Sequence, residues 1–291
     1  MKSDIPDFPH PIFVGGSARS GSHAMGRLLE SHPRYHLLDV EARLHCSRGG
    51  LADLLKGETD LDAFCERTMT EWWRRGLRHN RGLRTIVDRP TLVTALDEFR
   101  AGYDDDPWAA GRRLIHAVLD PSAERAGRPT WVDLSGSNIR QGPVLAKLFP
   151  EARFIHMVRD GRAVAAALLR KRLATDDRAT AFRHWVKRIR RSHVGIGQMP
   201  RERIETILLE DLSAHDREGS FERLVRLLEL DDPAPMREYF DREISPERAH
   251  VGAWRERIAP DDVRWLDRQY RRTVRRLHGE GIDWIPDPAR E

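Results

Sequence analysis

The sequence contains few of the residues that build metal centres, disulfide frameworks or membrane segments. Its 291 residues include two cysteines, Cys46 and Cys65, which have neither metal-ligand spacing nor the number that a disulfide framework needs. No apolar run approaches the ~18 residues of a membrane helix. Residues 1–11 lack the basic and long apolar segments of a signal peptide. We therefore expect a cytoplasmic protein with no bound metal and no membrane segment.

Lysine is also scarce, so most of the 50 basic residues are arginine. They are nearly balanced by 46 acidic residues, which leaves a net charge of +4. This balance predicts a mixed, solvated surface, and the basic–aromatic interleaving typical of single-strand nucleic-acid binding is missing. We expect no nucleic-acid partner, and we interpret the basic run from Lys187 to Arg191 as a solvated helix face.

Short apolar segments alternate with helical patterns along the chain. Strands are expected at residues 11–15, 130–134, 153–158 and 204–209, and helices at residues 139–149, 163–173 and 180–193. Such alternation predicts a parallel sheet covered by helices on both faces. The stretch from about residue 44 to 128 has mainly helical spacing, and we interpret it as a helical insertion within a single domain of residues 1–291.

A glycine-rich loop joins the first expected strand to a helix. Gly16 and Gly21 let the backbone approach a ligand, and a helix start offers unpaired N–H groups to an anion. Their spacing matches a Walker A loop, but Ser22-His23 stand where Lys-Ser/Thr would contact the phosphates and magnesium. This favours an anion site over an NTPase, and Arg19 within the loop offers a forked donor to phosphate or sulfate.

Four segments form a further pattern through their order and spacing along the chain. They are residues 12–22, residues 149–164 with the run Val158-Arg159-Asp160-Gly161-Arg162, Glu210-Asp211-Leu212, and Gly252-Ala253-Trp254-Arg255. Together they resemble the sulfotransferases that use 3′-phosphoadenosine-5′-phosphosulfate (PAPS). The first segment is similar to the family's 5′-phosphosulfate loop and the second to its 3′-phosphate-binding strand and helix. The segment Glu41-Ala42-Arg43 makes the protein-tyrosine sulfotransferase branch the most similar in motif style.

The resemblance implies a three-layer α/β fold like that of P-loop NTPases and a specific reaction. A sulfuryl group passes from PAPS to a hydroxyl of a small-molecule or peptide acceptor, PAP is released, and the helical insertion shapes the acceptor pocket. The residues implied to bind the nucleotide are Gly16, Ser17, Arg19, Ser20, Gly21, Ser22, His23, Arg159 and Arg248. Arg19 is also expected to stabilise the leaving phosphate. Glu41 is the candidate base for the acceptor's proton, with Asp39 as the alternative.

Departures from the family pattern leave other functions open. Ala167 stands where a serine usually contacts the 3′-phosphate, and Leu134 stands where many relatives carry a lysine. Arg162, Arg170 or Arg248 is expected to replace the missing serine hydroxyl. The alternatives are a non-catalytic PAP-binding relative, a P-loop phosphotransferase and a polyanion binder. The sequence identifies neither the acceptor nor the oligomeric state.

Overall fold

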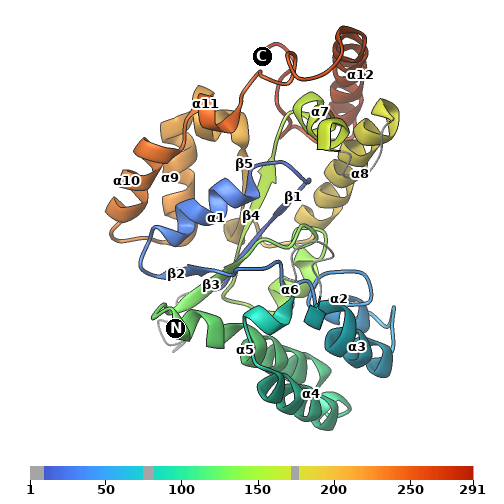
Figure 1. The fold of residues 1–291 in the computed structure, drawn as a ribbon, viewed down its shortest axis with the longest axis vertical. Helices are drawn as coiled ribbons and strands as arrows, with labels where there is room; N and C mark the ends of the chain where they lie inside the picture. Colours follow the sequence, from blue (N-terminus) through green and yellow to red (C-terminus); the bar gives the residue numbers. More distant parts are fainter. Residues whose placement is uncertain (1–9, 75–81, 172–176, 291) are drawn as a thin grey trace. The chain divides into compact units, whose positions relative to one another are not determined.

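The first strand forms where the apolar run predicts it. In the computed structural model, which describes residues 10–74, 82–171 and 177–290, β1 (Ile12–Gly16) is buried along its whole length. The other strands are β2 (Tyr35–Leu37), β3 (Thr130–Asp133), β4 (Arg153–Val158) and β5 (Ile204–Leu208). They form one five-stranded sheet in the order β2-β3-β1-β4-β5, which is flanked by helices (Figure 1). The predicted α/β fold with a parallel sheet is therefore confirmed.

Strand β2 is the one strand that the sequence analysis did not predict. It pairs in parallel with β3, with Tyr35 opposite Thr130, and β3 pairs in parallel with β1, with Ile12 opposite Val132. A strand of three residues is too short to show a period of two. Its pairing partner is about 95 residues further along the chain, so no local signal marks it.

The helices of the described residues vary in length from one turn to more than five. They are α1 (Ser22–Glu30), α2 (Leu51–Leu54), α3 (Leu61–Arg67), α4 (Arg89–Tyr103), α5 (Pro107–Arg125), α6 (Gly142–Leu148), α7 (Gly161–Lys171), α8 (Arg178–Ile196), α9 (Arg217–Leu228), α10 (Ala234–Glu243), α11 (Pro246–Ala249) and α12 (Pro260–Gly279). Several begin at an aspartate whose carboxylate accepts the first free N–H groups, as at Asp60, Asp88, Asp106 and Asp177. The expected insertion is helical, since it contains α2 to α5. No helix of the described residues is long and apolar enough to cross a membrane.

Contacts divide the chain into two units, residues 1–14 with 26–154 and residues 15–25 with 155–291. In the first unit, α4 and α5 lie side by side (Figure 1). The core of this unit surrounds Phe13, whose ring lies 5.3 Å from both the Trp131 and the Phe154 rings.

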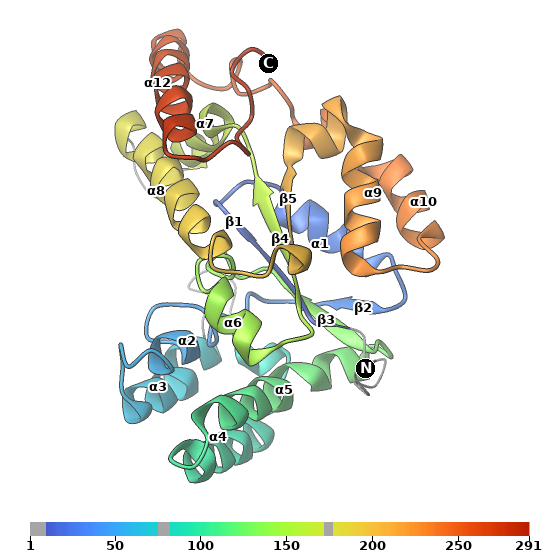
Figure 2. The ribbon, with the colours of Figure 1, turned by 180° about the vertical axis from the view of Figure 1, so that it is seen from behind.

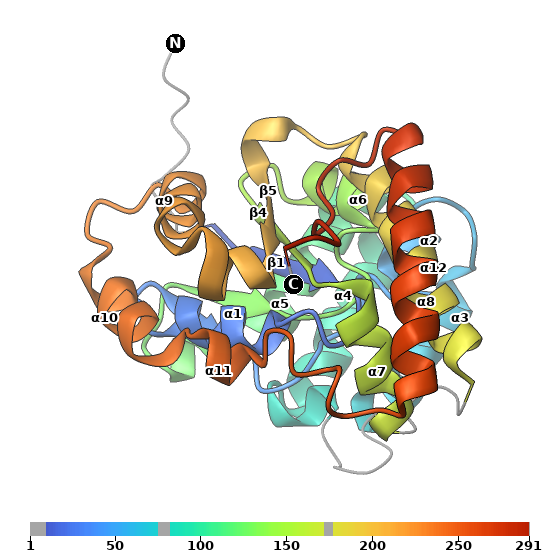
Figure 3. The ribbon, with the colours of Figure 1, turned by 90° about the horizontal axis from the view of Figure 1, so that it is seen from above.

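In the second unit, α7, α8 and α12 pack together, as seen from behind in Figure 2 and from above in Figure 3. Their shared core includes the buried rings of Trp185 and Tyr270. Trp185 also fixes the end of β4, because its indole N–H donates to the Arg159 carbonyl at 3.1 Å. The same ring leaves no space for a side chain at Gly161, where a Cβ atom would lie 2.6 Å from it. This packing places the start of α7 next to the end of β4.

Candidate functional site

The loop between β1 and α1 is a tight turn that depends on glycine. Gly16 has a φ of 154°, and a Cβ atom there would lie 2.1 Å from the Met157 carbonyl oxygen. The backbone N–H and the hydroxyl of Ser20 both donate to the Ser17 carbonyl, at 3.2 and 2.7 Å. Gly21 has a φ of 93°, and a Cβ atom there would lie 2.7 Å from Leu209. The loop therefore follows a path that side chains at both glycines would block.

Several hydrogen-bond donors of this loop are free to meet an anion. The first turn of α1, which starts at Ser22, contains no acidic residue to neutralise its N–H groups and dipole. The hydroxyl of Ser17 is buried and has no hydrogen-bond partner among the described residues. A buried hydroxyl without a partner is costly, so this atom fits a ligand oxygen. Arg19, an exposed residue, has left-handed backbone with a φ of 70°.

Arg159 connects this loop to a distant turn. Its guanidinium donates to the Arg19 carbonyl at 3.2 Å, to the Ala249 carbonyl at 3.0 Å and to the His250 carbonyl at 3.3 Å. Arg159 directly follows β4, at the carboxyl edge of the sheet where ligands of open α/β folds bind. This one side chain therefore holds the glycine-rich loop and the turn after α11 against each other.

The turn after α11 belongs to a cluster of positive charge. Partial burial of the His250 ring lowers its pKa below 6.5, and the guanidiniums of Arg257, Arg159 and Arg170 lower it further. Arg170 lies on α7, one turn beyond Ala167, and Arg257 lies between α11 and α12. Three guanidiniums that disfavour a proton on one imidazole make a region that an anion would stabilise. The sequence analysis did not predict His250 or Arg257, because neither lies within a family motif.

Arg162 does not join this cluster, which corrects one of the expectations about the missing serine hydroxyl. Its side chain is fully buried and pairs with Asp160 at 2.6 Å and with Asp267 at 2.5 Å. The guanidinium also lies over the Tyr270 ring, 4.6 Å from its centroid. All of these contacts are structural, so Arg162 is excluded as a substitute donor to a phosphate.

Two other predicted residues are engaged in ion pairs. Arg248 is exposed and pairs with Glu243 at 2.6 Å. Glu41 accepts from the Arg43 guanidinium, with the Nε–Oε2 distance at 2.8 Å, and both side chains are about one third exposed. Arg43 has a left-handed φ of 62°. Each of these pairs has to open, or offer its remaining atoms, before Arg248 or Glu41 can contact a ligand.

A buried polar network stands next to Glu41. Asp133, at the end of β3, lies 3.2 Å from Nε2 of His45 and accepts the Ala42 N–H at 3.0 Å and the Asn138 amide at 2.8 Å. Burial opposes charge on both groups. The Cys46 sulfur and the Asp133 carboxylate nevertheless raise the pKa of His45 well above 6.5, and the His45 ring lowers the pKa of Asp133 to about 2. The pair is therefore ionised at neutral pH and fixes the backbone on the carboxyl side of Glu41.

The structure thus brings together part of the predicted site. One unit, residues 15–25 and 155–291, contains all the predicted nucleotide-binding residues, which are those at 16, 17, 19–23, 159 and 248. The other unit contains Glu41 and Asp39. Within the described part of the chain, no three His, Cys, Asp or Glu side chains are grouped as ligands of a metal ion.

Comparisons with known proteins point to one family. A family model described as "Sulfotransferase family" matches residues 11–234. A Caenorhabditis briggsae protein named "Putative protein-tyrosine sulfotransferase" is 26% identical over 192 residues, which cover 64% of this chain. They cover 54% of that protein, so the chain spans about half the length of this curated relative. The solved "Sulfotransferase Domain from the Curacin Biosynthetic Pathway" has a TM-score of 0.55 at 15% identity, over 90% of this chain and 97% of that one, which is a likeness of fold.

Proposed function

The chain belongs to the sulfotransferase family, and we propose that it transfers a sulfuryl group from PAPS to a hydroxyl group of an acceptor. One observation carries the donor assignment. Arg159 joins two separate anion-binding regions, the glycine-rich loop and the cluster around His250, through its bonds to the Arg19 and His250 carbonyls. PAPS has negative charge at both ends of its ribose, at the 5′-phosphosulfate and at the 3′-phosphate. A ligand of this kind fits two joined anion regions better than a ligand with one phosphate chain.

The residues of each region have distinct proposed roles. Ser17, Arg19 and the N-terminus of α1 bind the 5′-phosphosulfate. Arg170, His250 and Arg257, together with Arg159, bind the 3′-phosphate, and the charges of the three arginines replace the hydroxyl that Ala167 lacks. Arg248 stays a prediction for the same group, on the condition that it leaves Glu243.

The proposed transfer is an in-line displacement at sulfur. The acceptor oxygen bonds to sulfur while the bond from sulfur to the 5′-phosphate oxygen breaks, so negative charge grows on the departing phosphate. A fixed guanidinium at Arg19 stabilises that charge more in the transition state than in the ground state. The acceptor's proton passes to a carboxylate, for which we propose Glu41. Its oxygen Oε2 is held by Arg43, so the proton goes to Oε1 or to a carboxylate released from Arg43.

Calorimetry with three nucleotides tests the donor site. We expect PAP to bind wild-type protein more tightly than AMP, which lacks the 3′-phosphate, and more tightly than Mg²⁺-ATP. Arg257→Ala should weaken PAP binding by about 10- to 150-fold, since one charge-assisted contact contributes about 1.5–3 kcal/mol, and should leave AMP binding unchanged. Arg264→Ala, an exposed arginine on α12 paired with Asp261, is the matched control. Equal losses for PAP and AMP in Arg257→Ala, or tighter binding of Mg²⁺-ATP, would contradict the assignment.

Transfer itself needs a separate measurement with radiolabelled PAPS and a panel of phenols, sugars, alcohols and tyrosine peptides. We expect label to pass to one acceptor class, and Glu41→Gln to slow the transfer without weakening PAP. Normal transfer by Glu41→Gln would remove Glu41 as the base and leave the donor site standing.

A non-catalytic PAP-binding relative is the second candidate function. The observation that favours it is Leu134, which is buried at the end of β3 where many relatives carry a lysine. This candidate predicts tight PAP binding with no transfer to any acceptor of the panel. Transfer by the wild-type chain excludes it.

A further inference from the structure

The basic run on α8 lines a groove that the proposed transfer does not use. The groove has a volume of about 610 Å³ and lies between α8 and α12, which run side by side in Figure 3. Its lining residues are Ala179, Phe182, Arg183, Val186, Lys187, Arg190, Arg191, Trp265, Gln269, Thr273 and Arg276. None of them belongs to the glycine-rich loop or to the cluster around His250. Lys187, Arg190 and Arg191, which belong to the run interpreted from sequence as a solvated face, are exposed as that interpretation expects and also line this groove.

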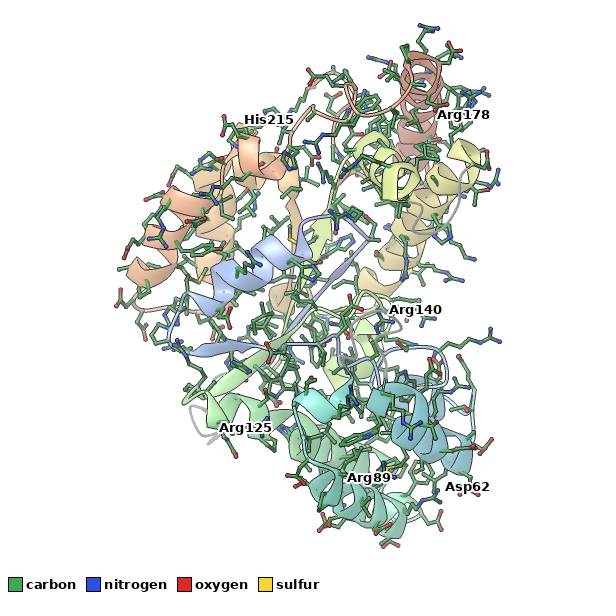
Figure 4. All side chains as sticks on the ribbon, in the orientation of Figure 1. Asp62, Arg89, Arg125, Arg140, Arg178 and His215 are labelled. Atoms are coloured by element: carbon green, nitrogen blue, oxygen red, sulfur yellow. The ribbon has the colours of Figure 1, made fainter. Side chains whose placement is uncertain are left out.

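The floor of this groove is apolar and aromatic. Phe182 and Val186 are buried, and the Phe182 ring meets the Trp265 ring edge to face with 6.3 Å between centroids. The Trp265 ring is also held by Arg178, labelled in Figure 4, whose guanidinium lies 5.2 Å from the ring centroid and pairs with Asp262. Binding is stabilised when an apolar side chain of a partner covers a floor of this kind, because apolar surface is then removed from water.

The rim of the groove is positively charged. Five cationic side chains line it, at residues 183, 187, 190, 191 and 276, and no aspartate or glutamate is among the lining residues. Arg190 pairs with Glu280 at 2.6 Å, while Arg183 is 3.7 Å from Asp177. Lys187 and Arg191 have no ion pair within the described residues. An anionic partner would therefore relieve the repulsion among these charges.

The spacing of the charges selects the shape of the partner. Residues 183, 187 and 191 follow each other at one cation per helical turn, about 6 Å apart. From Ala179 to Arg191 the lining extends for about 18 Å along α8, since each helical residue rises about 1.5 Å. Carboxylates four residues apart on another helix have the same spacing, and the apolar stripe of that helix would face Phe182 and Trp265. A flat membrane surface does not enter a groove, and the phosphates of a duplex make no use of an aromatic floor.

We propose that this groove binds an acidic amphipathic helix of a partner protein. The partner's apolar stripe covers the floor, and its carboxylates pair with Lys187, Arg191 and their neighbours on the rim. This is a helix-in-groove interaction with charge complementarity along both edges. It is separate from the proposed nucleotide site, because the lining residues and the proposed nucleotide-binding residues do not overlap.

A designed peptide tests the proposal with the full-length chain. The probe is a fluorescein-labelled helix of about 18 residues with a leucine stripe flanked by glutamates four residues apart. A scrambled peptide of the same composition and a peptide with lysine in place of glutamate are the ligand controls. Fluorescence anisotropy should show at least about tenfold tighter binding of the acidic helix than of either control peptide.

Two groove variants then locate the binding. Lys187→Glu/Arg191→Glu should weaken binding of the acidic helix by at least about tenfold. Gln269→Glu, which keeps the size of the side chain and adds one negative charge, should weaken that binding by several-fold. Arg268→Glu/Arg275→Glu makes the same charge change at exposed positions of α12 outside the lining and should have little effect. PAP affinity should stay the same in all three variants, which shows that the fold is intact.

Four results would overturn the proposal. They are no binding of the acidic helix, equal binding of the scrambled peptide, an equal loss in Arg268→Glu/Arg275→Glu, and tighter binding of a short DNA duplex or of phosphatidylglycerol vesicles that is lost in Lys187→Glu/Arg191→Glu. The last result would assign the groove to nucleic acid or to a membrane surface instead.

Discussion

Replacing Asp133 by asparagine should destabilise the protein severely, although the substitution changes only one heavy atom of the side chain. The carboxylate accepts from Ala42, Ser135 and Asn138 and pairs with the His45 imidazolium, and both charged residues are fully buried. Asparagine has nearly the same shape, so packing is preserved. It leaves a buried imidazolium without its counter-charge and turns an amide N–H₂ toward donors.

The expected loss follows from the burial of the pair. Removing one partner of a buried ion pair costs about 3–5 kcal/mol, because the remaining charge stays desolvated. Total stabilities are about 5–15 kcal/mol, so Asp133→Asn removes a large share of the free energy of unfolding. For a chain of this size the thermal midpoint should fall by roughly 5–8 °C. Urea unfolding followed by circular dichroism gives the free-energy difference directly.

The pH dependence supplies a second, independent readout. The pKa of His45 is raised above 6.5 in the folded protein, so its contribution is complete below pH 6.5 and is lost as pH rises through the folded pKa. The pKa of Asp133 is lowered from 3.8 to about 2, so its contribution is complete above pH 3.8 and is lost as pH falls through about 2. The difference in stability between wild type and Asp133→Asn should therefore be largest between these limits and should shrink toward high pH.

The matched control is Asp62→Asn, which removes an exposed carboxylate that pairs with Arg100 (Figure 4). Exposed ion pairs contribute little, so this variant should unfold almost as wild type does. A loss below about 1 kcal/mol in Asp133→Asn, or one equal to that of Asp62→Asn, would refute the reasoning that the buried pair is ionised.

Four further outcomes follow from the site. Arg19→Ala should slow sulfuryl transfer by about 100–1000-fold in initial rates, the usual effect of losing one donor to a developing negative charge, while the fold stays intact by circular dichroism. Ala167→Ser should tighten PAP binding by about tenfold in calorimetry, because a hydroxyl bonded to a charged group contributes about 1.5 kcal/mol, and AMP should serve as the unaffected control. Arg162→Met should lower the free energy of unfolding in urea by about 3–5 kcal/mol, since Asp160 loses its buried partner, and a near-neutral result would contradict the structural role. PAP affinity should rise as pH falls from 8 toward 6 in wild type more than in His250→Gln, because a bound phosphate raises the lowered pKa of His250, and identical pH profiles would remove His250 from the site.

The parts of the fold that depend on local pattern were predictable from the sequence. Strands β1, β3, β4 and β5 and helices α6 to α8 formed within a few residues of their expected positions, because each has a clear apolar run or helical period. Strand β2 was not predictable, since its three residues are stabilised as a strand by pairing with β3, which lies far along the chain. The same distinction applies to the site. The glycine-rich loop is a local motif, whereas the roles of single arginines depend on distant partners.

Arg162 and Arg159 illustrate that distinction most clearly. They are three residues apart in one motif, and the sequence offers both as phosphate donors. Asp267, 105 residues after Arg162, draws its guanidinium into the core, whereas Arg159 donates to the carbonyls of Arg19 and Ala249 instead. Only tertiary contacts decide between an arginine paired inside the core and one that bridges two surface loops, and a chain with 50 basic residues contains many such choices.

Arg159 also explains how the proposed site can tolerate the loss of a serine hydroxyl at Ala167. Its guanidinium bonds the loop that we propose receives the 5′ end of the nucleotide and the turn that we propose receives the 3′ end. The geometry between the two anion regions is therefore set before ligand arrives, and a preorganised site loses less entropy on binding than a flexible one. One hydrogen bond to the 3′-phosphate is then a modest part of the proposed affinity, because Arg170 and Arg257 both act electrostatically on His250. The departure at Ala167 is thus compatible with the proposed nucleotide binding.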